Sequence, residues 1–304
     1  MAAPFPSPTT KWHSNTYPSI SPSRLELSAK GKVVLVTGGG TGIGAETARS
    51  FAEAGASRIA LLGRREQPLL DTKATIEKQY PGVEVFTAPT DVTNKSQMDD
   101  AFKRFAGNGT IDVVVSNAAL TGPLDSVEEA EEERFLGAIQ SNLRGSLLTA
   151  QGFLRHASKN AIAIDVNSSA AHHNFTAAMA SYSIAKFAVY RLWNSVAFAH
   201  PEHSIFHIQP GVVDTDMNRA VGGVAAAGFE DHVSLPGNFN VWLASPEAQF
   251  LKGKFLWTNW DVDELKARAK QIGSGKELNI DLVGWPWGEA DYKREWSFEA
   301  AGLK

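Results

Sequence analysis

Tyr182 and Lys186 are the residues whose types and spacing point most directly to chemistry. They lie four residues apart in a run of good helix formers, residues 181–193, and positions i and i+4 share one face of a helix. An ammonium beside a phenol favours the phenolate and lowers the tyrosine pKa toward working pH. Tyr182 is therefore a candidate general acid/base. Because most such pairs are solvated surface pairs, the interpretation depends on the rest of the chain.

A glycine-rich turn near the start of the chain predicts a nucleotide site. Residues 33–36 form a continuous apolar, β-branched run, typical of a strand buried on both faces. Thr-Gly-Gly-Gly-Thr-Gly-Ile-Gly follows at 37–44, and residues 45–54 read as a helix. Such a turn lets the backbone approach a pyrophosphate at the helix N-terminus. A glycine cluster alone would be a flexible turn, but its place between strand and helix favours nucleotide binding.

The end of the second predicted strand, residues 58–62, favours NADP over NAD. An acidic residue there would hold the ribose 2′-OH of NAD, but the sequence has Gly63, Arg64 and Arg65. The two arginines can pair with a 2′-phosphate; the alternative is two surface arginines at a helix start. Thr41 adds no cation to the glycine loop.

The remaining chain alternates apolar runs with helical patterns. This alternation predicts an α/β fold, a Rossmann-type doubly wound parallel sheet of about seven strands with helices on both faces and right-handed crossovers. An acidic stretch at 128–136 is expected to be a solvated helix face. Further strands are expected at 83–86, 111–115, 161–166, 205–208 and 254–257, and further helices at 67–78, 96–105, 139–153, 182–199, 238–250 and 262–272.

Composition limits the kind of protein. With 304 residues, 43% hydrophobic and 20% charged, the chain resembles an ordinary globular protein. It has no cysteine, which excludes disulfides and thiolate catalysis. A net charge of −4 without a basic block argues against nucleic acid as the partner. No apolar run is long enough for a membrane span, and the N-terminus lacks a secretory pattern, so a cytoplasmic protein is expected.

The chain divides into an expected arm, residues 1–29, and one domain, residues 30–304. The arm is rich in proline and is either disordered or held on the body by Trp12, Tyr17 and Ile20. Residues 216–235 are rich in glycine and alanine and are expected to form a mobile substrate loop or helical lid, and a C-terminal extension is expected from about residue 259.

Taken together, these features resemble the short-chain dehydrogenase/reductase family, from about Lys30 to Trp257. The arm and the tail resemble fungal members. Asn117-Ala118-Ala119 and Trp260-Asp261 depart from the commoner Asn-Ala-Gly and Asp-Gly-Gly of the family. The matching parts are Thr-Gly-x-x-x-Gly-x-Gly at 37–44, Asp91, Asn117-Ala118-Ala119, Asn142, Ser169, Tyr182-x-x-x-Lys186, and Pro210-Gly211 with Thr215.

The resemblance implies four catalytic residues. Tyr182 would protonate the substrate carbonyl during reduction, and Lys186 would lower the pKa of Tyr182 and bind the nicotinamide ribose. Ser169, thirteen residues before Tyr182, would donate a hydrogen bond to the substrate oxygen. Ser168 is the alternative serine. Asn142 would hold a water that relays protons.

The resemblance also implies the cofactor contacts. Asp91 would bind the adenine amine, and Val213 and Thr215 the carboxamide. Arg144 has a surface role as its alternative. The expected contacts are Thr37, Gly38, Thr41, Gly42, Ile43, Gly44, Arg64, Arg65, Asp91, Val92, Asn117, Ala118, Ala119, Arg144, Tyr182, Lys186, Pro210, Gly211, Val213 and Thr215.

The predicted function is an NADP(H)-dependent ketone reductase or alcohol dehydrogenase, in a setting such as fungal secondary metabolism. The alternatives are an isomerase or cyclase on the same fold and a non-catalytic cofactor sensor. The substrate is expected to be a bulky, partly apolar small molecule, and the protein a homodimer or homotetramer paired through residues 139–153 and 182–199. His172 and His173 are not expected to bind a metal; with Phe175 and Met179 they are candidates for the pocket wall.

Overall fold

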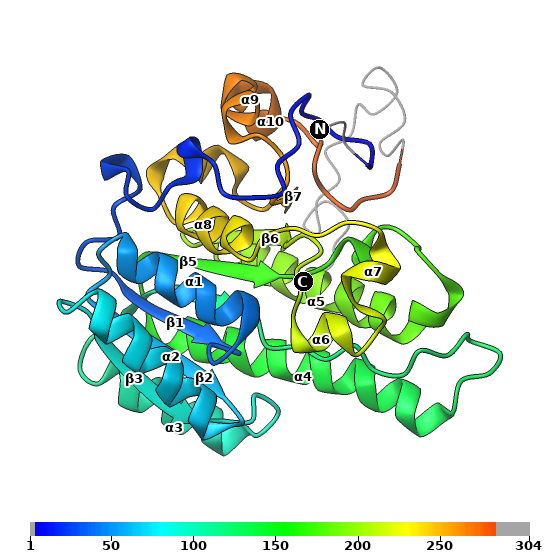
Figure 1. The fold of residues 1–304 in the computed structure, drawn as a ribbon, viewed down its shortest axis with the longest axis horizontal. Coiled ribbons are helices and arrows are strands. Elements are labelled where there is room, and N and C mark those ends of the chain that lie inside the picture. Colours follow the sequence, from blue (N-terminus) through cyan, green and yellow to red (C-terminus); the bar gives the residue numbers. More distant parts are fainter. Residues whose placement is uncertain (1–3, 284–304) are drawn as a thin grey trace, which may run out of the picture.

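The computed structural model describes residues 4–283, and its centre is a parallel sheet (Figure 1). The seven strands stand in the order β3-β2-β1-β4-β5-β6-β7. Every strand of the sheet was predicted, with ends shifted by a few residues at most. Their bounds are β1 Val33–Thr37, β2 Arg58–Gly63, β3 Glu84–Pro89, β4 Ile111–Ser116, β5 Ala157–Val166, β6 Ser204–Gln209 and β7 Phe255–Trp257.

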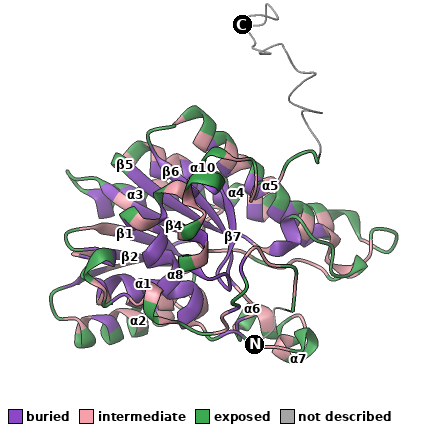
Figure 2. Cartoon of the chain, turned by 90° about the horizontal axis from the view of Figure 1, so that it is seen from above, coloured by how far each residue is buried: buried purple, intermediate pink, exposed green. Residues whose placement is uncertain are grey.

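Helices cover both faces of the sheet, so the strands are buried between them (Figure 2). The apolar core accordingly falls into two clusters. One contains Phe51 of α1, Leu69 of α2 and Phe239 of α8, and the other contains Phe102 of α3 and Trp193 of α5. The helices are α1 Gly42–Glu53, α2 Glu66–Gln79, α3 Lys95–Ala106, α4 Glu132–His156, α5 Ala180–Ala199, α6 Asp216–Arg219, α7 Gly223–Ala227, α8 Ser234–Leu243, α9 Val262–Ala267 and α10 Ala269–Ser274.

The strand order creates a switch point next to β1. The chain runs from β1 outward to β3, then returns to β4 on the other side of β1. Val36 of β1 is in register with both Leu61 of β2 and Val115 of β4. In such sheets the crevice outside the carboxyl ends of the strands is where ligands bind. The glycine turn after β1 lies at this crevice.

Four of the predicted helical ranges were wrong in their limits. The separate helices expected at 128–136 and 139–153 are one helix, α4, which continues through Gly137. Residues 128–131 lie before this helix and are not part of it. The helix expected at 238–250 breaks after Leu243, and a 3₁₀ helix, Pro246–Leu251, begins at a proline. The helix expected at 262–272 is α9 and α10, which are separated at Arg268.

The N-terminal arm is docked on the body. Trp12 and Ile20 are buried, and Trp12 forms an antiparallel bridge with Trp260. In Figure 1 the dark-blue arm runs past α8 and α9, and both helices contact its 3₁₀ turn Pro18–Ile20. The arm was expected to be either disordered or held on the body, and the structure shows it held on the body. Within the expected C-terminal extension, residues 284–304 lie outside the described part of the chain.

Candidate active site

Ser169 and Tyr182 line one cavity of about 550 Å³. Ser169 begins the 3₁₀ helix Ser169–Ala171 just beyond β5, and Tyr182 lies in the first turn of α5. Both residues are buried. Two elements that lie close together in the chain thus bring the predicted hydroxyl pair into a shared space.

Lys186 is buried behind Tyr182 on the same face of α5, as its i+4 spacing predicted. Its Nζ lies 5.7 Å from the centre of the Tyr182 ring and donates a hydrogen bond of 2.9 Å to the carbonyl oxygen of Val166. The backbone carbonyl of Lys186 accepts a 3.2 Å bond from Nδ2 of Asn167. An ammonium has three donors, so the bond to Val166 leaves Nζ with capacity for further partners.

The two serines after β5 have different surroundings. The backbone amide of Ser169 donates to Oε1 of Gln209 at 2.8 Å, which fixes the residue against β6. The Ser168 hydroxyl oxygen accepts a bond from the amide of Ala170 at 3.2 Å and so caps the short helix. This capping contact favours Ser169 as the residue that presents its hydroxyl to a substrate.

Asn142 on α4 is buried, and its side chain is bonded to the loop after β4. Its Oδ1 accepts a bond from the amide of Leu120 at 3.1 Å, and its Nδ2 donates to the carbonyl oxygens of Leu120 and Ala138 at 2.9 and 3.0 Å. Both amide hydrogens are therefore engaged. The side chain fixes the loop, and the predicted water relay stays a prediction.

The glycine turn is tied to the end of β4. The Thr37 hydroxyl accepts bonds from the amides of Asn117 and Ala118 at 2.9 and 3.1 Å, and Nδ2 of Asn117 donates to the Thr37 carbonyl at 3.0 Å. Gly38 has a φ of +70°, which favours glycine. A Cβ at Gly44 would lie 2.2 Å from the carbonyl oxygen of Gly38. The backbone of the turn is thus packed too closely for side chains.

This turn fits the phosphates of a dinucleotide. The N-cap of α1, Thr41, makes no side-chain capping bond, so the first amides of the helix are not satisfied by it. Free amides at a helix N-terminus bind anions. Ile43 and Thr215 line the cavity that contains Ser169, so the turn and the hydroxyl pair face the same space.

Of the two arginines at the expected ribose site, Arg65 forms an ion pair with another residue of the described range and Arg64 does not. Arg64 and Arg65 are exposed, and Nη2 of Arg65 lies 3.3 Å from Oδ2 of Asp216 on α6. The pKa of Asp91 is lowered, chiefly by bonds from the amide and hydroxyl of Thr93 and in part by Arg64. Arg144 is exposed on α4 and is not among the residues of the cavity.

Asp231 is a site residue that the sequence did not reveal. Its Oδ2 accepts a 2.8 Å bond from the amide of Val212, and its Oδ1 accepts a 2.9 Å bond from Nδ2 of Asn259. A Cβ at Gly211, whose φ is +91°, would lie 2.6 Å from Oδ2 of Asp231. The carboxylate thus shapes the turn of the predicted cofactor contacts Pro210 and Gly211, which precedes the predicted carboxamide contacts Val213 and Thr215. In the sequence Asp231 is an acidic residue in a glycine-rich loop, and no characteristic spacing from other residues marks it as part of a site.

The pocket-wall prediction is half right. Phe175 and Met179 line the cavity, but His172 and His173 do not. His172 instead lies behind a lining residue as a bonding partner, because its Nε2 accepts a 3.1 Å bond from Nε1 of Trp257. Among residues 4–283, no group of three or more His, Asp or Glu side chains is arranged to hold a metal ion. No helix in that range is long and apolar enough to cross a membrane.

Comparison with known proteins identifies the family. Residues 32–223 match the family described as short chain dehydrogenase. A short chain dehydrogenase/reductase of Claviceps purpurea is 31% identical over 284 residues, which cover 92% of this chain and 95% of that protein. The short chain dehydrogenase/reductase AacuD of Aspergillus aculeatus is 32% identical over 285 residues, covering 92% and 98%.

Solved structures agree in fold. A dehydrogenase/reductase from Sinorhizobium meliloti has a TM-score of 0.70 at 26% identity over 79% of this chain and 97% of that one. A short chain dehydrogenase from Burkholderia cenocepacia in complex with NADP also has a TM-score of 0.70, at 24% identity over 77% and 99%. The class of protein that fold and site define is therefore a nicotinamide-dependent oxidoreductase. The chain belongs to the short-chain dehydrogenase/reductase family.

Proposed function

We propose that the protein is an NADP(H)-dependent oxidoreductase that interconverts a ketone and a secondary alcohol. The observation that carries the proposal is the shared cavity of Ser169, Tyr182, Ile43 and Thr215. This cavity contains the two hydroxyl groups that would bind a carbonyl oxygen. It also reaches the end of the glycine turn, which suits a dinucleotide. When bound, the nicotinamide coenzyme supplies or accepts the hydride.

In the proposed mechanism, the residues of this chain handle the oxygen and its proton. Ser169 donates a hydrogen bond to the carbonyl oxygen, where negative charge develops during reduction. Tyr182 gives its phenolic proton to that oxygen, or removes it in the reverse direction. Lys186, held by the Val166 carbonyl at 2.9 Å, stabilises the phenolate by its positive charge.

The coenzyme preference is supported by the end of β2. Gly63 leaves no carboxylate to bind a free 2′-OH, and Arg64 is an exposed cation beside it. A guanidinium binds phosphate through charge-assisted hydrogen bonds. The fungal relatives support a place in fungal secondary metabolism.

The test is oxidation of NADPH in the presence of a panel of ketones, with Tyr182→Phe as the variant. Loss of a general acid costs roughly 10²–10⁴-fold in rate, so we expect kcat to fall by about that factor while the Kd for NADPH stays unchanged. Tyr190→Phe is the matched control, because Tyr190 is a buried tyrosine of the same helix that is not among the cavity residues.

The outcomes separate the three functions. Retention of more than about a tenth of kcat in Tyr182→Phe would contradict the assignment of the acid. Conversion of a substrate without net NADPH oxidation would indicate an isomerase or cyclase. Binding of NADPH without any turnover would indicate a sensor.

A further inference from the structure

Besides Tyr182, five aromatic side chains from four separate segments line the cavity. Phe5 and Trp12 belong to the N-terminal arm, Phe175 to the loop before α5, Phe229 to the substrate loop and Trp257 to β7. We call these five residues the aromatic cluster. Two of them come from a part of the chain that precedes the family match at 32–223.

Phe5 is the centre of the aromatic cluster. Its ring centroid lies 6.4 Å from that of Trp12, 6.0 Å from Phe175, 5.9 Å from Phe229 and 5.3 Å from Trp257. The interplanar angles run from 43° to 86°, so no two of these rings are stacked face to face. Rings held at such angles can present faces and edges to a further ring, which is the geometry that aromatic pairs prefer.

The aromatic cluster is incomplete on its own. Phe175 is 45% exposed, whereas Trp12 and Trp257 are each 7% exposed. The two indoles are therefore buried, Phe5 and Phe229 are half-buried, and Phe175 is exposed. Binding of an apolar group that covers an exposed phenyl ring is favourable, because it removes the apolar surface of the ring from water.

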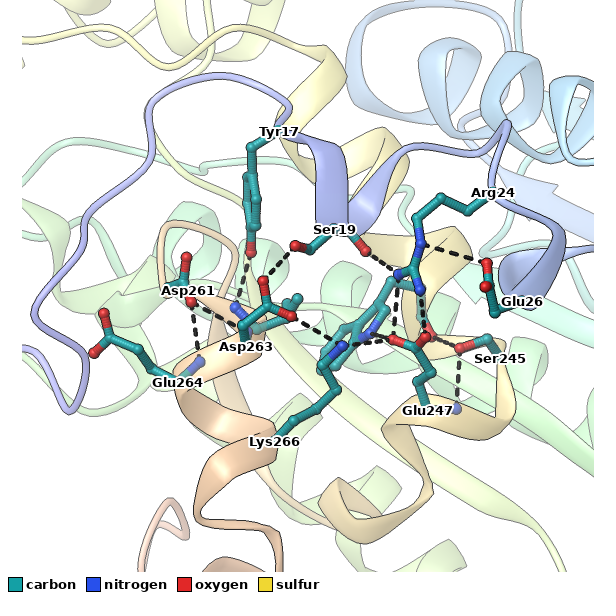
Figure 3. A network of polar contacts seen from close by, with 12 residues as sticks. Tyr17, Ser19, Arg24, Glu26, Ser245, Glu247, Asp261, Asp263, Glu264 and Lys266 are labelled. Atoms are coloured by element: carbon teal, nitrogen blue, oxygen red, sulfur yellow. Dashed lines mark hydrogen bonds and ion pairs between the residues drawn. The ribbon is translucent and has the colours of Figure 1, made fainter.

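Phe5 is placed by the docked arm, whose anchors are polar contacts with the segment after β7 (Figure 3). The Tyr17 hydroxyl donates to the Trp260 carbonyl at 3.1 Å and accepts from the Val262 amide at 3.0 Å. His13 donates its Nε2 proton to Asp261 at 2.8 Å and stacks on Tyr17, with ring centroids 3.6 Å apart.

A second set of anchors ties the arm to residues 247–266. Arg24 pairs with Glu247 at 2.7 Å, and the same carboxylate accepts a 3.0 Å bond from Lys266 (Figure 3). Ser19 donates to Asp263. Before Trp12, the carbonyl of Pro8 accepts a 3.2 Å bond from Nη1 of Arg268. The arm is therefore bonded to the body on both sides of Trp12 in the chain, so its aromatic part is held against the cavity.

The charge of the cavity restricts what can bind there. Among residues 4–283, its lining contains no Lys, Arg or His, and its single acid is Asp231. Both carboxylate oxygens of Asp231 already accept hydrogen bonds from the protein. A substrate with a carboxylate or phosphate near its ketone would find no cation in this wall, and burying an unpaired charge is costly.

We propose that the N-terminal arm is a wall of the substrate site, and that the aromatic cluster selects an uncharged ketone that carries an aromatic ring fused or attached beside its carbonyl group. The proposal rests on the proposed function, because the ketone is placed by Ser169 and Tyr182. Phe5 is its specificity-determining residue. It contacts the loop of Phe175 on one side and the substrate loop of Phe229 on the other.

The experiment measures binding without turnover. Protein saturated with NADP⁺ is titrated calorimetrically with α-tetralone, which has an aromatic ring fused to a cyclic ketone, and with α-decalone, its saturated counterpart of the same carbon skeleton. Both ligand and coenzyme are oxidised, so no reaction follows. An aromatic pair contributes about 0.5–1.5 kcal/mol beyond area burial, and several rings line this cavity, so we expect about tenfold tighter binding of α-tetralone.

Three variants locate the effect. Phe5→Ala should weaken α-tetralone about tenfold, and Phe5→Leu, which keeps an apolar side chain, should lose the preference while α-decalone affinity stays near that of wild type. Leu25→Ala is the matched control, because Leu25 lies in the arm, is 89% exposed and is not among the cavity residues. It should leave both affinities unchanged.

Failure of this proposal differs from failure of the proposed function. No α-tetralone binding to wild type, or equal binding to wild type and Phe5→Ala, would overturn the aromatic wall even if other ketones are reduced. Ring-dependent binding that Phe5→Ala abolishes would support the wall even if no ketone is reduced with NADPH, and in that case the oxidoreductase proposal alone would fail.

Discussion

Arg65 and Asp216 form an ion pair, 3.3 Å from Nη2 to Oδ2, that joins the start of α2 to the start of α6. The pair connects the expected ribose site to the substrate loop. The pKa of Asp216 is lowered, first by its bond to Arg219 and then by its bond to Arg65. Both partners are exposed, so the pair is screened by solvent. Its main consequence is that Arg64, which forms no ion pair with any described residue, is the freer cation for a 2′-phosphate.

Gly63→Asp with Arg64→Ala should reverse the coenzyme preference. The new carboxylate would bond the ribose diol of NAD and repel a 2′-phosphate. A Cβ at Gly63 would meet only the Leu69 side chain, at 3.4 Å, so the aspartate fits. A charge-assisted bond contributes on the order of 1.5–3 kcal/mol, roughly ten- to a hundredfold in affinity, and exposure favours the low end.

The measurement for this variant is kcat/KM for NADPH and NADH with one substrate. Arg65→Ala is the control, and we expect it to change the ratio less, because Arg65 is already paired with Asp216. Equal use of both coenzymes by wild type, or no shift in the double variant, would show that these arginines have only a surface role.

Gly44→Ala should lower both the stability and the NADPH affinity of the protein. The added Cβ would lie 2.2 Å from the Gly38 carbonyl oxygen, a backbone atom that cannot move without the turn. Overpacking typically costs about 1–3 kcal/mol. Gly82→Ala is the control, because nothing lies within 4 Å of its added Cβ. Thermal unfolding and coenzyme titration of both variants check the prediction. An unchanged Tm in Gly44→Ala would contradict the close packing of the turn.

The parts of the fold that the sequence predicts are those governed by local pattern. The strands were found because continuous apolar, β-branched runs bounded by turns have few other readings. The break near Ala244 was missed, although Ser245 and Pro246, which cap and begin the next 3₁₀ helix, are a local signal for it. The break at Arg268 was missed because residues 262–272 contain no glycine or proline to mark it. Helix α4 was divided wrongly, because Gly137 has a low helix propensity that the long helix overrides.

The site was predictable where its residues follow one another at fixed spacing. Tyr182 and Lys186 share a face of α5 because of helix geometry, and the glycine turn follows from its strand and helix. Phe5 and Asp231 were missed, because each acts through contacts with residues far away in the sequence. The ring of Phe5 meets that of Trp257, 5.3 Å away, and no pattern in the sequence records such a contact.

The protein is predicted to form a homodimer or homotetramer through α4 and α5. Leu147 of α4 and Ile184, Phe187 and Phe198 of α5 are 40%, 46%, 49% and 86% exposed, an apolar set that a partner copy would cover. Sedimentation at micromolar concentration should show a species of at least about twice 32.8 kDa. Phe187→Asp should dissociate it, since burying an unpaired charge is costly.

The control for the assembly is Leu25→Asp, because Leu25 is 89% exposed but lies on the arm. It should sediment as wild type does. A wild-type protein that sediments only at 32.8 kDa would rule the assembly out.

Asp261 should make the docking of the arm depend on pH. Its burial alone would raise its pKa, but the bond from His13, the Glu264 amide and the charge of Lys11 outweigh this and leave the pKa lowered. A carboxyl group whose pKa is lower in the folded state than in the unfolded state stabilises the folded state. The full effect is present when the pH is above the unfolded-state pKa, about 4. That contribution is lost as pH falls through the folded value, so the arm should detach only in acid. Nearby Asp263 and Glu264 also have lowered pKa values and act in the same direction.

The variant that tests this is Asp261→Asn. Asparagine can still cap α9, but it removes the charge that faces His13, so the free energy of unfolding should fall by about 1–2 kcal/mol at pH 7. The difference from wild type should be lost once the pH falls below the lowered folded pKa of Asp261, where the wild-type carboxyl group also becomes neutral. Hydrogen exchange at the His13 amide, which donates to the Asn259 carbonyl at 2.9 Å, reports arm docking directly.

The control is Asp71→Asn, because Asp71 is an exposed residue of α2. If amide protection at His13 did not change as the pH fell through the lowered pKa of Asp261, or if Asp261→Asn left it unchanged at pH 7, the carboxylate would not be what holds the arm.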